Sequence, residues 1–183
     1  YYIFASMTLG VWVSDDLVKW ENHKLPSELP LYDYAPDVRV MGEYVYFCAS
    51  KKGEKCDRYR TKDILNGPYE KIEGTFDFWD PNLFVDDDGK VYFYWGCSNE
   101  TPMWGVELDP QTMNPKGEKK ELIYADPYKY GYERIGDDNS ELISPILRVP
   151  GWINMTADII CSMPLQVHSI IPMEMEYMSQ TSR

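Results

Sequence analysis

The sequence contains only two histidines and four cysteines among its 183 residues. The cysteines include no C-x-x-C pair, which argues against a zinc site and a dense disulfide framework, so we expect free thiols and no metal. Basic residues are also scarce, because 18 Lys and Arg stand against 30 Asp and Glu for a net charge of −12. This acidity excludes nucleic acid and an anionic membrane surface as partners.

Long apolar runs are absent as well. None approaches the ~18 residues that a membrane-spanning helix needs, so we expect a soluble protein. A hydrophobic content of 44 % argues against disorder, and no stretch has a helical period. What is abundant is aromatic: Tyr 15, Trp 6 and Phe 6 make up 15 % of the chain, a bias typical of strands and of surfaces that stack on sugars. The composition predicts an all-β protein.

Short apolar or alternating runs bounded by turn residues recur along the chain. They predict strands at 1–6, 11–14, 38–40, 44–50, 82–85, 91–96 and 104–108. Pro36 aligns with Pro81, and Tyr46 aligns with Tyr92, at spacings of 45 and 46 residues. A repeat of this size is typical of a four-stranded β-propeller blade, although kelch-like and sandwich arrangements share some of these cues.

Two local patterns refine this organisation. The run Asp86-Asp87-Asp88-Gly89 invites comparison with a calcium loop, but it lacks alternating ligands and the acid at position 12, so it predicts a hairpin turn. The opening run 1–6 has the pattern of a buried strand, so we expect the chain to begin within a domain.

Three motifs resemble glycoside hydrolase family 43. They are the first-blade strand Gly10-Val11-Trp12-Val13-Ser14-Asp15-Asp16-Leu17-Val18-Lys19-Trp20 and the two blade starts Tyr34-Ala35-Pro36-Asp37-Val38 and Asp80-Pro81-Asn82-Leu83-Phe84-Val85. The likeness runs from Tyr1 to about Trp152. We therefore divide the chain into a partial propeller, residues 1–153, and an aberrant tail, residues 154–183.

The resemblance implies a five-bladed propeller, of which this chain would form three to four blades. It also implies inverting hydrolysis of pentose or galactose linkages in plant polysaccharides, with no cofactor. Inversion needs a carboxylate base and a protonated acid about 6.5–9.5 Å apart on opposite faces of the sugar. In this family a third carboxylate raises the pKa of the acid and orients it.

Asp80 matches that third carboxylate, because it opens the Asp-Pro-x-Leu-Phe motif of the third blade. Asp37 lies at the equivalent point of the second blade, where propeller geometry is expected to turn its side chain toward the same axial pocket. We expect this pocket to be an open acidic cleft, with Asp37 as a substrate contact. An Asp-Pro pair at a strand start is otherwise a turn, which is how we interpret Asp109-Pro110.

Aromatic and acidic neighbours complete the predicted site. Trp79 and Tyr34 precede the two blade starts, where they would either stack on a sugar face or pack between blades. Glu133 lies in a loop, Tyr132-Glu133-Arg134-Ile135-Gly136, that resembles one placed over the pocket in certain family members. We interpret Glu133 as a ligand contact.

The two proton-transfer residues of the family are not found. The base belongs to an Asp-Pro segment that would fall before Tyr1. The acid should follow Gly151-Trp152-Ile153, where Asn154 stands instead of Glu. We therefore expect this chain to be inactive.

The tail differs in composition from the blades. Five of the nine methionines fall in residues 155–183, which contain no Gly, Lys or Trp. A shifted reading frame explains this composition. The third base of a Met codon followed by the first two bases of a Glu codon encodes Gly, and followed by the first two bases of a Thr codon it encodes Asp. Residues 155–167 then permit H-D-G-R-Y-Y-L-Q-Y-A-A-P-G, which repeats the turn and strand of the third blade. The other interpretation is an authentic Met-rich tail.

Three functions follow from these observations. The first is a glycosidase acting on oligo- or polysaccharides, such as an α-L-arabinofuranosidase or a β-xylosidase. The second is a carbohydrate-binding propeller without catalysis. The third is a fructan-cleaving propeller, whose Asn-Asp-Pro-Asn-Gly motif resembles Asp80-Pro81-Asn82, although Leu83 stands where that family has Gly. The sequence leaves the compartment open: secreted, periplasmic or cytoplasmic.

Overall fold

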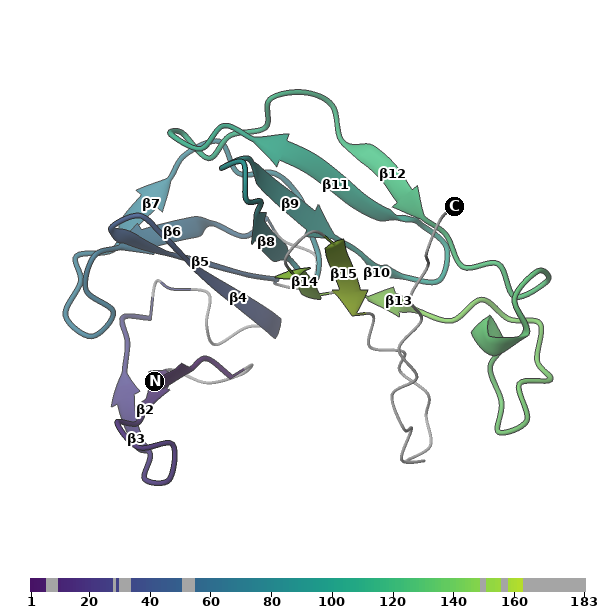
Figure 1. Ribbon diagram of the computed structural model, residues 1–183, viewed down its shortest axis with the longest axis horizontal. Helices are drawn as coiled ribbons and strands as arrows, with labels where there is room; N and C mark the ends of the chain where they lie inside the picture. Colours follow the sequence, from purple (N-terminus) through teal and green to yellow (C-terminus); the bar gives the residue numbers. More distant parts are fainter. Residues whose placement is uncertain are drawn as a thin grey trace.

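The computed structural model describes residues 1–5, 10–27, 29, 34–50, 55–148, 151–155 and 158–162. Within these ranges all regular structure is β-strand apart from one short 3-10 helix, η2 (Gly131–Glu133). The larger sheets follow one another in chain order (Figure 1). No helix of the described residues is long and apolar enough to cross a membrane. The predicted all-β class is confirmed.

Two sheets have the four antiparallel strands of a complete blade. The second sheet consists of β4 (Tyr34–Met41), β5 (Tyr44–Ser50), β6 (Arg58–Thr61) and β7 (Glu70–Ile72), in that order. The third sheet consists of β8 (Asn82–Val85), β9 (Val91–Trp95), β11 (Met103–Leu108) and β12 (Lys120–Ile123). Because neighbours in space are neighbours in sequence, each sheet is a simple meander, as a propeller blade requires.

The strand register confirms the repeat. Tyr46 on β5 lies opposite Arg39, and Tyr92 on β9 lies opposite Phe84. Arg39 and Phe84 are themselves one repeat apart in sequence. Tyr46 and Tyr92 therefore occupy equivalent places on the second strand of successive blades.

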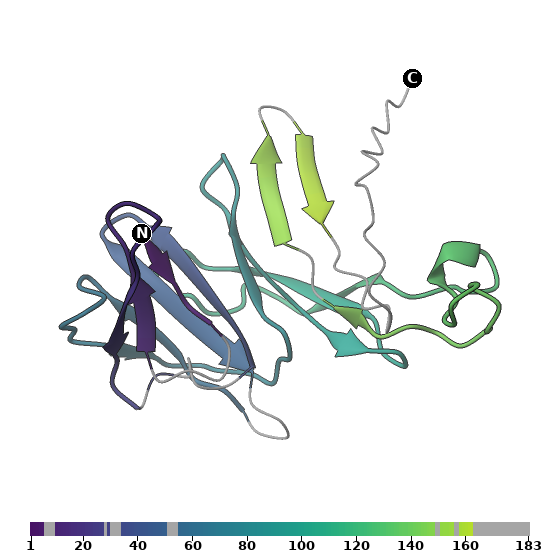
Figure 2. The ribbon, with the colours of Figure 1, turned by 90° about the horizontal axis from the view of Figure 1, so that it is seen from below.

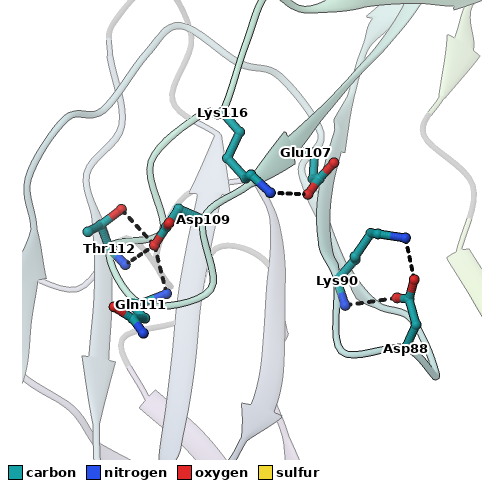
Figure 3. A network of polar contacts seen from close by, with 7 residues as sticks. All are labelled: Asp88, Lys90, Glu107, Asp109, Gln111, Thr112 and Lys116. Carbon is teal, nitrogen blue, oxygen red and sulfur yellow. Dashed lines mark hydrogen bonds and ion pairs between the residues drawn. The ribbon is translucent and has the colours of Figure 1, made fainter.

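The predicted turns are also found. Gly42 and Gly89 have φ of +59° and +80°, values that a glycine adopts without steric cost. At the Asp109-Pro110 turn, the Asp109 carboxylate accepts hydrogen bonds from the Gln111 and Thr112 amides, both at 2.9 Å (Figure 3). These donors lower the pKa of Asp109. Its role is that of a turn residue, as the sequence indicates.

The first sheet contradicts one expectation. It has three strands, β1 (Tyr2–Ile3), β2 (Gly10–Val13) and β3 (Glu21–Lys24). The opening run was expected to be a buried strand, yet Tyr2 and Ile3 are 47 % and 46 % exposed. The reason is that β1 lies at the edge of its sheet, where apolar residues have no neighbouring strand on one side.

The two complete blades pack face to face around one aromatic core. Tyr46 and Cys48 of β5 meet Leu83 of β8 and Phe93 of β9 in this core, which also holds Met113. On the other side of β5, Phe47 joins a second core with Val11 of the first sheet. Strand β5 is therefore buried on both faces, which explains why its sequence is a continuous apolar run.

The chain beyond the third blade forms smaller sheets. Strand β10 (Cys97–Ser98) pairs with β13 (Leu147–Arg148), and β14 (Gly151–Met155) forms a hairpin with β15 (Asp158–Ser162). Strand β14 contacts β8, so the hairpin lies beside the third sheet; its two strands are the upright pair of arrows in Figure 2. Residues 163–183, which hold most of the proposed frame-shifted tail, lie outside the described residues.

The division at residue 153 leads to a proteolysis prediction. We expect chymotrypsin to cleave first in the tail, after Leu165 or Tyr177, and to leave the buried β9 strand intact, because residues 155–183 lack the turn glycines of a blade. Trypsin is the control, because no Lys or Arg stands between Arg148 and Arg183. A tail as resistant as β9, measured by mass spectrometry of the fragments, would show that it is authentic folded sequence.

Candidate functional site

Asp80 lies at the end of the linker that leads into β8. Its side chain is buried, with 9 % of the residue exposed, so it does not point into solvent on the rim. Its φ is +49°, a left-handed conformation that few residues other than glycine adopt and that Asp and Asn tolerate best. The following Pro81 is buried and fixes the direction of the chain into β8. A strained, buried acid at a strand start is a functional-site candidate.

The same turn occurs at the start of the second blade. Ala35, which precedes Pro36, has φ of +47° and stands one repeat before Asp80. The structural equivalent of Asp80 in the second blade is thus Ala35, and that of Asp37 is Asn82. Asp37 had been expected at the point equivalent to Asp80, but it lies two residues further along its strand.

Trp79 ties the turn to the third sheet. Its backbone carbonyl accepts a hydrogen bond of 2.7 Å from the amide of Gly96, at the end of β9. Its side chain is half-buried. Tyr34, the other predicted aromatic, begins β4 with its backbone opposite Ser50, and its side chain lies outside the described residues.

The carboxylate of Asp37 reaches across to the third blade. Its Oδ2 accepts a hydrogen bond of 2.6 Å from the Leu83 amide, and the side chain of Asn82 also hydrogen-bonds to it. Burial raises the pKa of Asp37, while the Arg39 guanidinium, with Nε 3.8 Å from Oδ2, acts in the opposite direction. The structure therefore brings Asp37 to the strand that Asp80 precedes.

Glu133 is placed elsewhere. It ends η2, is buried, and its carboxylate accepts a hydrogen bond from the backbone amide of Asp126 in the same loop. This loop between β12 and β13 extends away from β4 in both views (Figures 1 and 2). The carboxylate closes its own loop, and the structure does not bring it together with Asp37.

Two surface hollows of about 330 and 350 Å³ are lined by other residues. The first is lined by Phe76, Asp77, Trp95, Val106, Pro115, Gly117 and Lys119. The second is lined by residues of the first sheet and its turn, among them Asp15, Asp16 and His23. Neither is the open acidic cleft expected beside Asp80. No cluster of three His, Cys, Asp or Glu that could hold a metal ion occurs in the described part of the chain.

Sequence reasoning missed three polar residues at the seam between the blades. Arg39 donates to the Leu83 carbonyl at 2.6 Å, and Arg58 donates to the Met113 carbonyl at the same distance. The side-chain oxygen of Asn82 is buried with no hydrogen-bond partner among the described residues. Asp37 and Arg39 are two residues apart in a strand, so the sequence already indicated that both charges lie on the same side of that strand.

Fold and site together define a partial β-propeller with a buried acid at a blade start. The sequence pattern of "Glycosyl hydrolases family 43" matches residues 1–133. The chain belongs to this family, which confirms the resemblance seen in its motifs. No curated protein sequence matches the chain significantly.

Solved structures show the same fold. A thermostable family-43 glycoside hydrolase matches 87 % of this chain with a TM-score of 0.64 at 21 % sequence identity. An α-L-arabinofuranosidase from Clostridium thermocellum matches 87 % of this chain with a TM-score of 0.61 at 15 % sequence identity. A bifunctional GH43-CE protein of Bacteroides eggerthii matches 87 % of this chain with a TM-score of 0.59 at 17 % sequence identity. The chain spans 56 %, 53 % and 21 % of these proteins, respectively.

Proposed function

We propose that this chain forms part of the sugar-binding propeller of an inverting glycoside hydrolase that removes arabinose or xylose units from plant polysaccharides. The observation that carries the proposal is the buried Asp80 in its left-handed turn, within the part of the chain that matches family 43. The similarity to an α-L-arabinofuranosidase supports the pentose class. The family match favours this function over a fructan-cleaving one.

In this proposal Asp80 raises the pKa of a general acid and orients it. A carboxylate beside a second carboxyl group disfavours ionisation of that group, because two like charges repel in a site of low dielectric. A raised pKa keeps the acid protonated at neutral pH, so that it can give its proton to the leaving oxygen of the sugar. Trp79, half-buried and next to Asp80 in the sequence, is proposed to stack its ring on the sugar.

The remaining predicted sugar contacts are supported to different degrees. Tyr34 belongs to the second-blade start and is proposed as the partner of Trp79 on the sugar. Glu133 remains a proposed ligand contact, with its carboxylate engaged in its own loop in this structure. Asp37 is close to the same blade start, and its role is developed below.

A carbohydrate-binding propeller without catalysis is the second candidate. The observation that favours it is Asn154, which stands where the family motif requires the acid. Asn cannot donate a proton to a leaving group at neutral pH, so binding would remain and hydrolysis would not.

The proposal is tested by sugar binding and turnover on the same sample. We expect the 183-residue chain to show no turnover of an aryl arabinofuranoside or xyloside, because inverting hydrolysis needs both acid and base. Arabinose- and xylose-containing oligosaccharides are expected to shift the NMR signals of the Trp79 indole and the Asp80 carboxyl. Asp80→Asn should weaken this binding, whereas Asp77→Asn, an exposed acid on the same linker, should not.

Two results would contradict the proposal. Turnover that Asp80→Asn abolishes would mean that this chain holds its own acid, with Glu133 the first candidate. Changes in NMR chemical shift centred on Phe76 and Lys119 would place the sugar in the hollow that these residues line, and not beside Asp80.

A further inference from the structure

Asp37 and Arg39 hold the two backbone groups of one residue in the next blade. The Leu83 amide donates to Asp37 Oδ2 at 2.6 Å, and Arg39 Nε donates to the Leu83 carbonyl at 2.6 Å. The two side chains lie two residues apart on β4, hence on the same side of the strand, with Nε 3.8 Å from Oδ2. We call this pair the clamp, in which Arg39 is the donor and Asp37 the acceptor.

The clamp acts on an open sheet edge. Strand β8 ends the third sheet, with β9 as its neighbour on one side. In an antiparallel strand the amide and carbonyl of one residue point to the same side. Since both groups of Leu83 are taken by β4 side chains, they face away from β9, on the edge where backbone groups would otherwise lack a ladder partner.

Leu83 is three residues from the strained turn at Asp80. Between them lie Pro81, whose φ is fixed by its ring, and Asn82, whose side chain also hydrogen-bonds to Asp37. On the other side of the turn, the Trp79 carbonyl is held by Gly96 at 2.7 Å. A non-glycine residue keeps a left-handed conformation only where its surroundings fix the chain on both sides.

The same pair of charges does not recur one repeat later. The residues one repeat after Asp37 and Arg39 are Asn82 and Phe84, which cannot form an ion pair. The charged clamp therefore acts on the strand that Asp80 precedes, and the corresponding positions of that strand do not repeat it.

We propose that Asp37 and Arg39 are positioning residues that grip the Leu83 backbone and thereby fix the Asp80 turn in the orientation needed to act on the general acid. This rests on the function proposed above for Asp80. It differs from the direct sugar contact expected for Asp37 from the sequence, and it makes Arg39 an equal partner.

The test is NMR of the full chain, with no need for turnover. In Asp37→Ala we expect amide exchange at Leu83 to rise by about tenfold or more relative to Phe93 in the middle of the same sheet, because a charge-assisted hydrogen bond is lost. The carboxyl ¹³C titration of Asp80 should shift in the same variant. Asp37→Asn keeps an oxygen acceptor and should restore most of the protection at Leu83.

Two further variants complete the design. Arg39→Met leaves Asp37 in place and should also shift the Asp80 titration. Lys62→Met removes an exposed ion pair with Glu43 on the same sheet and should change neither signal.

The outcomes separate positioning from general stability. Equal acceleration of exchange at Leu83 and Phe93 would mean that Asp37 only stabilises the fold, and an unchanged Asp80 titration in both Asp37→Ala and Arg39→Met would overturn the proposal. Neither readout depends on hydrolysis, so failure of the clamp is distinct from failure of the glycosidase function, which sugar titration reports.

Discussion

Replacing Arg58 by alanine is expected to lower the free energy of unfolding by about 3–5 kcal/mol. Arg58 is 3 % exposed, and its guanidinium donates to the carbonyls of Met113 at 2.6 Å and Gly74 at 3.2 Å. It also lies 5.2 Å above the ring of Phe76. Alanine would leave both carbonyls without this donor and open a cavity between the blades. Urea unfolding followed by Trp fluorescence measures the loss.

The control is Arg60→Ala, two residues along the same strand. Arg60 makes an exposed salt bridge of 2.8 Å with Glu70, so its loss should cost under about 1 kcal/mol. Burial lowers the pKa of Arg58, because the charged guanidinium loses hydration there. Arg58→Met fills most of the volume of the arginine side chain and should lower the free energy of unfolding by about 2 kcal/mol. If Arg58→Met were as stable as the native chain, the cost of burying the guanidinium would equal what its hydrogen bonds contribute.

Replacing Phe93 by alanine is expected to lower the free energy of unfolding by about 3–5 kcal/mol as well. Phe93 is fully buried, and its ring packs edge to face with Phe78 at 5.0 Å and Phe76 at 5.3 Å between centroids. The ring sits in the core between two sheets, whose hydrogen-bonded strands limit how far the surroundings can close on the space. The control is Val40→Ala, a strand residue that is 73 % exposed, for which we expect less than about 0.5 kcal/mol.

A small loss in Phe93→Ala would mean that the core between the second and third blades is loosely packed. Calorimetry distinguishes this from a change in the unfolded chain, because a native core that loosens also loses unfolding enthalpy. Both large predictions concern the seam between the second and third blades, to which Arg58 and the Asp37–Arg39 clamp also belong.

The sequence determined the first two strands of each complete blade and their repetition, whereas β6, β7 and β12 were not among the predicted strands. Alternating apolar residues, turn glycines such as Gly42 and Gly89, and the Pro36 and Pro81 blade starts are local signals, so they specify local structure without knowledge of the rest of the chain. The motifs around Asp80 also determined the family, which the match over residues 1–133 shows.

Only the tertiary structure decided what the charged residues of the seam do. Leu83 lies 46 residues from Asp37 and 44 from Arg39, and Met113 lies 55 from Arg58. These separations are about one repeat long, because a residue on one blade meets the corresponding region of the next. No local pattern around Asp37 or Arg58 reveals such a partner, and burial between two sheets, not residue type, made each of them a structural clamp instead of a solvated charge.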